Sequence, residues 1–492
     1  MSLYDTQSNT AIVVSHSNNK THEISGKEFD QQTTTLANTL KTFKGNVVAF
    51  QLDNTPAWLA LDFATRIIDK VAIPIAPFFS EQQTQYVINQ CGAAIFITDT
   101  LPGPNQHPAL SVMLFDCYCL YIYSQTVSKA VNYFDTTQKV TFTSGSTGEP
   151  KGVCLSAHSQ MQVAQSLCDK ININQPVHLC LLPLAVLLEN IAGVYAPLKS
   201  GGQVHLIPLN ELGFVGSSLA QPNALINAID KVNPNTLILV PELLTCLVTF
   251  AEQGWQPPKS LKFIAVGGAI VDKTIIVKAR SLNLPVYQGY GLSEAASVVS
   301  LNTVKNDNYH SAGRVLPHIQ TKITDNQLYI KGDLFLGYLN HPPHDQNQWY
   351  ATGDLVEQQN NTLFIKGRIK NLIITSMGRN VNAEWPESLL LSQSGILQAV
   401  VFGEGKPFLT AIIYVNSTLN KQSLTLLINN VNQQLPDYAR IKKWHCIAKP
   451  LSAQQGLLTT NNRPKRQAIS RHYHHVFEQF YRPGEVINEK FL

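Results

Sequence analysis

A run of hydroxyl-bearing residues, glycines and one lysine spans residues 141–152 (TFTSGSTGEPKG) and has the composition of a loop that holds a polyphosphate. Glycine lets the backbone turn its N–H groups towards an anion, hydroxyls add neutral donors, and lysine adds a mobile positive charge. The order differs from a Walker A loop, in which four residues separate the first glycine from Gly-Lys-Ser/Thr. A flexible surface loop is the alternative. The candidate ligands are Thr143, Ser144, Gly145, Ser146, Thr147, Gly148 and Lys151.

These residues need a scaffold, and a chain of 492 residues exceeds what one hydrophobic core usually supports. Short apolar runs, typical of buried strands, alternate with segments whose apolar residues recur every three to four positions. This alternation predicts an α/β domain with mostly parallel sheets. The expected strands lie at residues 47–50, 94–98, 204–209, 236–240 and 263–266, and the expected helices at residues 54–68, 223–231 and 242–251.

The pattern changes after about residue 366. The run NLIIT, the helix-like AEWPESLLL, the strand-like LQAVVFG and LTAIIYV, and a helical stretch near residues 425–434 predict a small α+β domain. Glycine and charge interrupt the apolar pattern at residues 366–370. We therefore expect a large domain over residues 1–368 and a small, mobile one over residues 369–492, hinged near Lys370.

Composition excludes several functions. The net charge of +4 suits anionic small molecules but is too weak to indicate a nucleic-acid partner. The eight cysteines are scattered without the spacing of a zinc site, so we expect reduced thiols. The N-terminus has neither the basic head nor the apolar run of a targeting segment, which predicts a cytoplasmic location.

Two stretches raise the question of membrane contact. Residues 179–198 are long and apolar, but Pro183, Glu189 and Asn190 interrupt them, and a central carboxylate is costly in lipid. We expect a buried segment or pocket wall there. The basic, aromatic tail from Arg463 onwards could contact a membrane surface or an anion; a solvated helix with an aromatic inner face is the alternative.

Five motifs in a fixed order make the chain resemble the adenylate-forming (AMP-binding) superfamily, and most of all its long-chain fatty acyl-CoA synthetases. The loop at residues 141–152 resembles the phosphate loop of that superfamily. The other four are AVGGA (265–269), YQGYGLSEA (287–295), YATGDL (350–355) and KGRIKNLIITSMGRNV (366–381). Each is weak alone, but their succession makes chance resemblance improbable.

The resemblance implies ATP and Mg²⁺ as cofactors, with coenzyme A as the acceptor substrate. Glu294 would hold Mg²⁺, and Ser293, where most relatives carry threonine, would bind the α-phosphate. Asp354 suits the ribose hydroxyls, because a carboxylate accepts two hydrogen bonds at once; a turn residue is the alternative. Arg368 would lie beside ribose and phosphates. The resemblance implies further cofactor-binding residues in two glycine motifs: Gly267, Gly268 and Ala269 in the adenine-binding segment, and Gly289, Tyr290 and Gly291 in the Tyr-Gly-x-Thr/Ser-Glu segment.

Lys370 stands where relatives carry the hinge of the small domain. In such enzymes the small domain swings between an adenylation pose and a pose that opens a thiol channel, so a hinge residue influences both half-reactions. A solvated linker charge is the alternative.

The chain departs from the family pattern near its end. GLLTTNNRPKR (456–466) resembles the ending in which a lysine reaches the reacting carboxylate and the α-phosphate, but the equivalent position is Arg463. Arginine keeps the charge, yet its planar fork binds oxyanions differently from an ammonium. Lys465 could serve if the loop shifted in register.

The segment LPLAVLLENIAG (182–193) resembles a long-chain acyl-CoA synthetase motif, with Val186 in place of its histidine and Glu189 retained. These two residues are candidates for the substrate pocket and favour an apolar acid. The implied reaction is ATP-dependent activation of a fatty or other apolar carboxylic acid as acyl-AMP, followed by transfer to coenzyme A. Two alternatives stay open: an acyl-AMP ligase that loads the phosphopantetheine of a carrier protein, and a non-catalytic adenylate-binding homologue.

Overall fold

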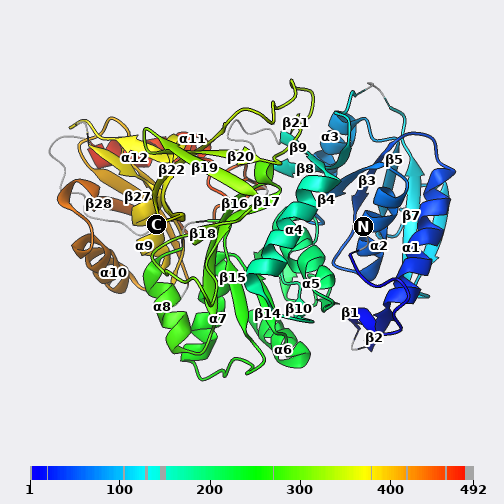
Figure 1. Cartoon of the computed structure of the whole chain (residues 1–492). Helices are drawn as coiled ribbons and strands as arrows, with labels where there is room; N and C mark the ends of the chain where they lie inside the picture. The colour runs from blue at the N-terminus through cyan, green and yellow to red at the C-terminus, as the bar shows by residue number, and fades with distance from the viewer. Residues whose placement is uncertain are drawn as a thin grey trace.

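Two large sheets form the body of the protein, and a small third layer packs at one side (Figure 1). The computed structural model describes residues 3–18, 20–103, 106–127, 131–143, 151–269, 271–377, 379–416, 419–459 and 462–481. Both sheets are parallel at their centres and antiparallel towards their margins. The predicted α/β class is thus confirmed.

The first sheet brings strands from the whole large domain into one layer. Its parallel half carries the two glycine motifs, one after β15 and one within β16, and its antiparallel half ends beside the small domain. The strand order is β19 (Ile319–Thr324), β20 (Gln327–Gly332), β22 (Tyr350–Gln359), β23 (Thr362–Arg368), β18 (Arg314–Val315), β17 (Ser297–Leu301), β16 (Val286–Leu292), β15 (Phe263–Val266), β14 (Thr236–Leu239), β10 (Val177–Leu179), β11 (Gln203–Leu206), β1 (Ala11–Ser17) and β2 (Lys20–Ser25).

The second sheet contains the two strands that flank the predicted phosphate loop in the sequence. Strands β8 and β9 pair in antiparallel fashion, and the short β21 pairs with β9 at the edge of the sheet. The strand order is β21 (Gly337–Tyr338), β9 (Lys151–Ser156), β8 (Thr137–Thr143), β4 (Val71–Ile75), β3 (Val47–Gln51), β5 (Ile95–Thr98), β7 (Tyr118–Ser124) and β6 (Leu110–Leu114).

The helices begin where the sequence supplies caps. Thr55 accepts a hydrogen bond from the Trp58 N–H and Pro56 opens α2, a proline position that fits because the first-turn N–H has no helical partner. Helix α4 packs between the two sheets (Figure 1). The helices of the large domain are α1 (Gly26–Lys41), α2 (Pro56–Ile67), α3 (Glu81–Cys91), α4 (Ala157–Ile171), α5 (Ala196–Lys199), α6 (Pro222–Val232), α7 (Pro241–Glu252) and α8 (Lys273–Ser281).

A fully buried ion pair ties the phosphate-loop strand to the helices beneath it. Lys139 of β8 lies 2.7 Å from Asp62 of α2, and both side chains are at most 1% exposed. The lysine also donates to Asn190 and Tyr195, which belong to a π-helix at Glu189–Tyr195. Because a buried charge is tolerated only when it is paired and hydrogen-bonded, this network fixes β8 against α2 and the π-helix.

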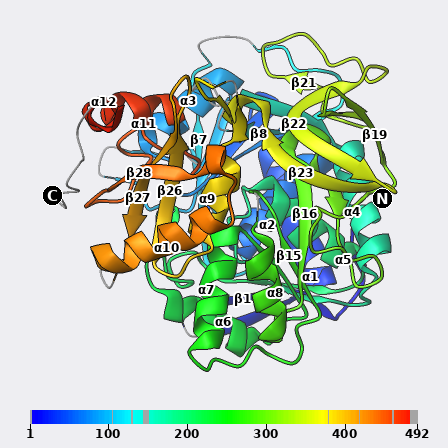
Figure 2. The ribbon, with the colours of Figure 1, turned by 90° about the vertical axis from the view of Figure 1, so that its left-hand side faces the viewer.

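The small domain has its own core. Alternate residues of β26 (Ile396–Phe402) and β27 (Leu409–Val415) face opposite sides, so Val401 and Ile413 pack towards α9 (Glu384–Leu391) and α10 (Lys421–Gln433). Val400 and Ile412 face α11 (Arg466–His472) and α12 (His474–Tyr481). Strand β28 (Ile441–Cys446) and the hairpin β24 (Leu372–Ile374) and β25 (Asn380–Asn382) complete it. Figure 2 shows this domain in front of the large one.

Candidate active site

The predicted metal ligand, Glu294, lies in a tight turn directly after β16. The turn is a short 3-10 helix at Ser293–Ala295, and Ala296 follows with a positive φ of 49°. Gly291 is required just before it, because a Cβ there would run into the carbonyl of Ser297 on the returning strand. Ser293 and Glu294 are half-buried and stand side by side in this turn.

Two tyrosines that the sequence analysis left unassigned hold the Glu294 carboxylate. The Tyr338 hydroxyl donates to Glu294 Oε1 at 2.6 Å, and it lies 2.9 Å from the Tyr350 hydroxyl. Burial, and then the charge of Glu294, raise the pKa of Tyr338, so this hydroxyl stays protonated as a donor. Tyr350 opens the YATGDL motif, which was the available signal.

Lys151 lies at the same place. It opens β9 opposite Thr143 of β8, and its ammonium stands 5.2 Å from the centre of the Tyr338 ring, within cation–π range. The predicted phosphate-loop lysine and the predicted metal carboxylate therefore share one tyrosine. The predictions for Ser144, Gly145, Ser146, Thr147 and Gly148, and for the Thr143 side chain, lie outside the described residues.

Asp354 lies in the interior of the first sheet and has two partners. Its Oδ2 accepts from the Tyr290 hydroxyl at 2.6 Å, and its Oδ1 from Arg368 Nε at 2.8 Å. Asp354 is only 2% exposed. Each carboxylate oxygen has a second lone pair, so the group retains acceptors for two hydroxyls, although ribose would have to share the site with Tyr290 and Arg368.

The two glycine motifs lie on neighbouring strands. Gly267, Gly268 and Ala269 follow β15, while Gly289, Tyr290 and Gly291 belong to β16. Gly268 has a φ of 86°, and a Cβ on Gly267 would stand 3.4 Å from the Gly289 carbonyl, so the two motifs approach closely.

The small domain delivers Arg463 to this place. Arg463 Nη2 donates to the Gly268 carbonyl at 2.7 Å, across 195 sequence positions. The pKa of Arg463 is lowered, first because the surrounding protein desolvates the guanidinium and then because Arg368 is near. The charges of Glu384, Asp354 and Glu294 partly offset this shift. The guanidinium thus stands within electrostatic reach of the predicted metal and ribose carboxylates.

Lys465 has a different position. Its backbone N–H donates to the Leu457 carbonyl at 2.9 Å, and it precedes the first residue of α11. The next residue, Arg466, makes a two-pronged ion pair with Glu387 at 2.6 and 2.7 Å. These contacts tie the Lys465 backbone into the small domain.

The predicted hinge is an exposed 3-10 turn. Lys370 lies within Ile369–Asn371, and it follows Gly367, whose φ is 132°. The Asn382 side chain packs where a Cβ of Gly367 would be, and it donates to the Arg368 carbonyl at 3.3 Å. The backbone between the two domains therefore passes through a position that suits glycine.

The two predicted pocket residues lie differently. Val186 is half-buried, in the turn before the π-helix. Glu189 is fully buried, and its carboxylate accepts from the Leu182 N–H at 3.1 Å and pairs with His178 Nε2 at 2.9 Å. Cys180 completes a group of three potential metal ligands, but the carboxylate and the imidazole already have these partners. Because its carboxylate is buried and bonded within the protein, Glu189 can influence a pocket only by holding the backbone at Leu182 in place.

The donor set fits the cofactors of the resemblance. Mg²⁺ is held in proteins by one or two carboxylates with waters and phosphates, and Glu294 is a half-buried, oriented carboxylate. Lys151, Arg368 and Arg463 place positive charge near this carboxylate from three separate elements.

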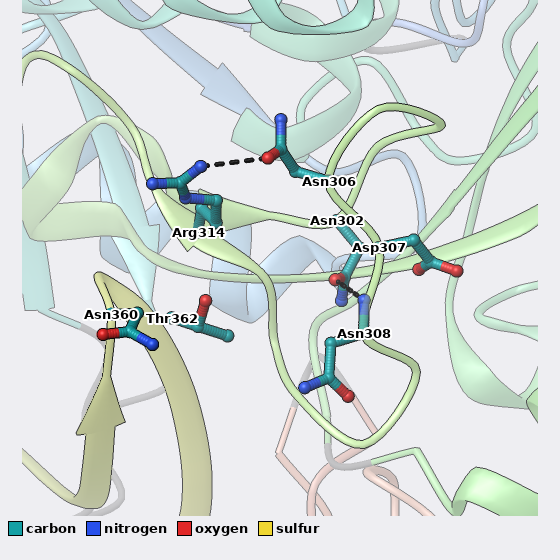
Figure 3. Close-up of a pocket in the computed structure, with 7 residues that line it drawn as sticks. All are labelled: Asn302, Asn306, Asp307, Asn308, Arg314, Asn360 and Thr362. Carbon is teal, nitrogen blue, oxygen red and sulfur yellow. Dashed lines mark hydrogen bonds between the residues drawn. The ribbon is translucent and has the colours of Figure 1, made fainter.

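A polar hollow of about 290 Å³ contains none of the predicted site residues (Figure 3). It is lined by Asn302, Asp307, Arg314 and Thr362, among others. Its polar groups are bonded to one another: Arg314 donates to Asn306 at 2.9 Å, and the Asn308 N–H donates to Asn302 at 2.8 Å.

Among the helices described in the structure, none combines the length and apolar character that crossing a bilayer requires.

Comparison with known proteins identifies the family. The family model described as "AMP-binding enzyme" matches residues 4–338, and the model of the "AMP-binding enzyme C-terminal domain" matches residues 370–485. The chain belongs to the AMP-binding enzyme family. This confirms the resemblance and the predicted class, an AMP-forming ligase of the acyl-CoA synthetase type, for which ATP, Mg²⁺ and coenzyme A are the cofactors.

Individual relatives are distant. The medium-chain fatty-acid–CoA ligase of Escherichia coli (strain K12) is 23% identical over 401 residues, covering 73% of this chain and 69% of that protein. A long-chain-fatty-acid–CoA ligase (ACSBG2) of Xenopus laevis is 22% identical, covering 71% and 61%. The solved O-succinylbenzoate coenzyme A synthetase of Bacillus subtilis, in complex with AMP, shares the fold with a TM-score of 0.74 at 18% identity, covering 94% of this chain and 95% of that one.

Proposed function

We propose that the protein activates an apolar carboxylic acid with ATP and transfers the acyl group to coenzyme A. In the first half-reaction a carboxylate oxygen forms a bond to the α-phosphorus and pyrophosphate leaves. In the second, the thiol sulfur bonds to the acyl carbon, its proton passes to solvent, and AMP leaves. The observation that carries the proposal is the bond from Arg463 of the small domain to Gly268 of the large one, beside Glu294 and Asp354.

The charges at this junction suit the first step. A carboxylate attacking a triphosphate brings anions together, so catalysis depends on positive groups placed before the reaction. Arg463 and Arg368 would face the α-phosphate and ribose, and Lys151 the outer phosphates. Mg²⁺ held by Glu294 would neutralise phosphate charge and orient the leaving group.

An apolar acid is the best-supported substrate class, and within it a fatty acid. Leu188, Ala192 and Ala265 are half-buried and contact two separate hydrophobic clusters, so an apolar surface lies along the seam between them. An amino acid would need a buried carboxylate for its ammonium. Within the described part of the chain, every buried carboxylate already contacts a basic side chain; the pairs are Asp62 with Lys139, Glu189 with His178, Asp354 with Arg368 and Glu387 with Arg466.

Coenzyme A is the proposed acceptor, and its access depends on the small domain. The Arg463 loop occupies the junction in the pose described here, so a second pose is needed for the thiol. Rotation at Lys370, three residues after Gly367, would supply this second pose. Residues 1–368 and 369–492 would then move as the two domains of the enzyme.

The test is mass spectrometry of purified protein with Mg·ATP and a pooled panel of fatty, aryl and amino acids, with and without coenzyme A. We expect an acyl adenylate from an apolar acid, which becomes acyl-CoA when coenzyme A is added. An adenylate that persists beside coenzyme A would favour carrier loading. The Glu294→Gln variant should release no pyrophosphate; near-wild-type release, or no adenylate with any acid in the wild type, would refute the proposal.

A further inference from the structure

A second contact joins the two domains next to Arg463, and we propose that it makes Asn462 a positioning residue for the adenylation step. The Ser217 hydroxyl donates to Asn462 Oδ1 at 3.0 Å, and Asn462 Nδ2 donates to the Ser217 carbonyl at 3.2 Å. The partners are 245 positions apart. The role of this contact rests on the proposed function, because it holds the Arg463 loop where the first half-reaction needs it.

The loop that carries Asn462 is hydrogen-bonded across its base. Its two sides are cross-linked, since the Lys465 N–H donates to the Leu457 carbonyl at 2.9 Å and the Thr459 N–H to the Arg463 carbonyl at 2.8 Å. Leu457 and Leu458 are buried in the small-domain core. Because Asn462 and Arg463 are consecutive in this loop, a contact that holds Asn462 also restricts where Arg463 can lie.

The receiving surface on the large domain is a short, packed hairpin. Ser217 lies at the tip of a hairpin formed by β12 (Phe214–Val215) and β13 (Ser218–Leu219). Gly216, with a φ of 60°, makes the two-residue turn possible. Phe214 and Leu219 pack against the neighbouring hydrophobic cluster, which anchors the hairpin to the large domain.

The contact is suited to being made and broken. Its two hydrogen bonds join neutral groups, and Ser217 and Asn462 are both half-buried. Separating them therefore leaves no buried charge without a partner. A neutral hydrogen bond of this kind shifts an equilibrium by roughly two- to tenfold. The pair therefore biases the small domain towards the adenylation pose without locking it, and the Arg463 bond to Gly268 adds to this bias.

The backbone at position 462 allows a clean test. Asn462 has a φ of 54°, a conformation that glycine adopts freely, so Asn462→Gly removes both hydrogen bonds while keeping the backbone. Ser217→Ala removes only the hydroxyl bond. Matched controls are Asn326→Gly, an exposed asparagine with a φ of 60°, and Ser218→Ala, an exposed serine of the same hairpin.

The experiment measures the two half-reactions separately. Adenylation is measured as pyrophosphate release from Mg·ATP with the acid that the mass-spectrometry panel identifies, and thioester formation as acyl-CoA made from added acyl adenylate. We expect adenylation to fall about tenfold in Asn462→Gly and about threefold in Ser217→Ala, with thioester formation unchanged or faster and both controls at wild-type rates. Adenylation in Asn462→Gly within twofold of wild type, or an equal loss in both half-reactions, would overturn the proposal.

Hydrogen exchange of residues 209–221 separates this contact from the proposed function. The amides of the hairpin should exchange faster in Asn462→Gly than in wild type and in Asn326→Gly. If the wild type forms no adenylate, the proposed function fails, yet faster exchange still supports the Asn462 contact. Equal exchange in all three proteins would refute the contact itself.

Discussion

The Tyr338 hydroxyl offers the sharpest test of how the site holds its metal carboxylate. Replacing Tyr338 by phenylalanine deletes the 2.6 Å hydrogen bond to Glu294 Oε1 and keeps the ring beneath the Lys151 ammonium. A hydrogen bond to a charged group contributes about 1.5–3 kcal/mol. At about 1.4 kcal/mol per factor of ten, losing it corresponds to roughly 10- to 150-fold. We expect the loss to fall on Mg²⁺ use, because the freed carboxylate must be ordered when the ion binds.

The assay is pyrophosphate release as a function of Mg²⁺ concentration at saturating ATP and acid. The Mg²⁺ concentration for half-maximal rate should rise at least tenfold in Tyr338→Phe, while unfolding by urea should change little, because Tyr338 and Glu294 are only half-buried. Tyr329→Phe is the matched control, since that hydroxyl contacts only Gln327 at 3.4 Å among the bonds described. An unchanged Mg²⁺ requirement in Tyr338→Phe would refute the reasoning.

Three further predictions each concern a single side chain. Arg463→Ala should slow adenylation by roughly 100-fold, the cost of one preorganised charge donor, while Lys465→Ala stays within about threefold; the reverse order would show that the loop shifts in register. Glu387→Gln should destabilise the small domain by about 1.5–3 kcal/mol in urea unfolding, because it leaves the half-buried Arg466 guanidinium without its counter-charge, and a change below about 1 kcal/mol would contradict this. Burial lowers the pKa of His205 to about 4, so the unfolded chain binds more protons below pH 6.5; stability should fall by up to about 1.4 kcal/mol per pH unit between pH 6.5 and 4, and a His205→Gln variant with an undiminished slope would refute that origin.

Much of the fold could be predicted because its signals are local. The expected strands at residues 47–50 and 263–266 became β3 (Val47–Gln51) and β15 (Phe263–Val266). The expected helix at residues 242–251 became α7 (Pro241–Glu252), which is one residue longer at each end; Pro241 begins it because proline suits a first helical turn. Periodicity and capping act over a few residues, so the sequence displays them directly.

The antiparallel margins of the sheets could not be predicted from periodicity. An apolar run shows that a strand is buried but not which strand lies beside it, and β23 pairs with both β18 and β22 in the first sheet. The same limit applied to Glu189. The motif predicted a place at a pocket, whereas its partners are His178, in the middle of β10, and the Leu182 N–H, and only the folded chain brings these groups to the carboxylate.

By itself, the sequence determined the chemical inventory: a hydroxyl- and glycine-rich segment ending at Lys151 and Gly152, a carboxylate at Glu294 after a glycine motif, Asp354, and an arginine at position 463. Only the tertiary structure decided which hydrogen-bond partners these groups have. Tyr338 reaches Glu294 across 44 positions, Arg463 reaches Gly268 across 195, and Ser217 reaches Asn462 across 245. The physical reason is range: hydroxyl–carboxylate and interdomain hydrogen bonds form only when atoms lie within about 3 Å, and strand order and domain pose set that proximity rather than local spacing.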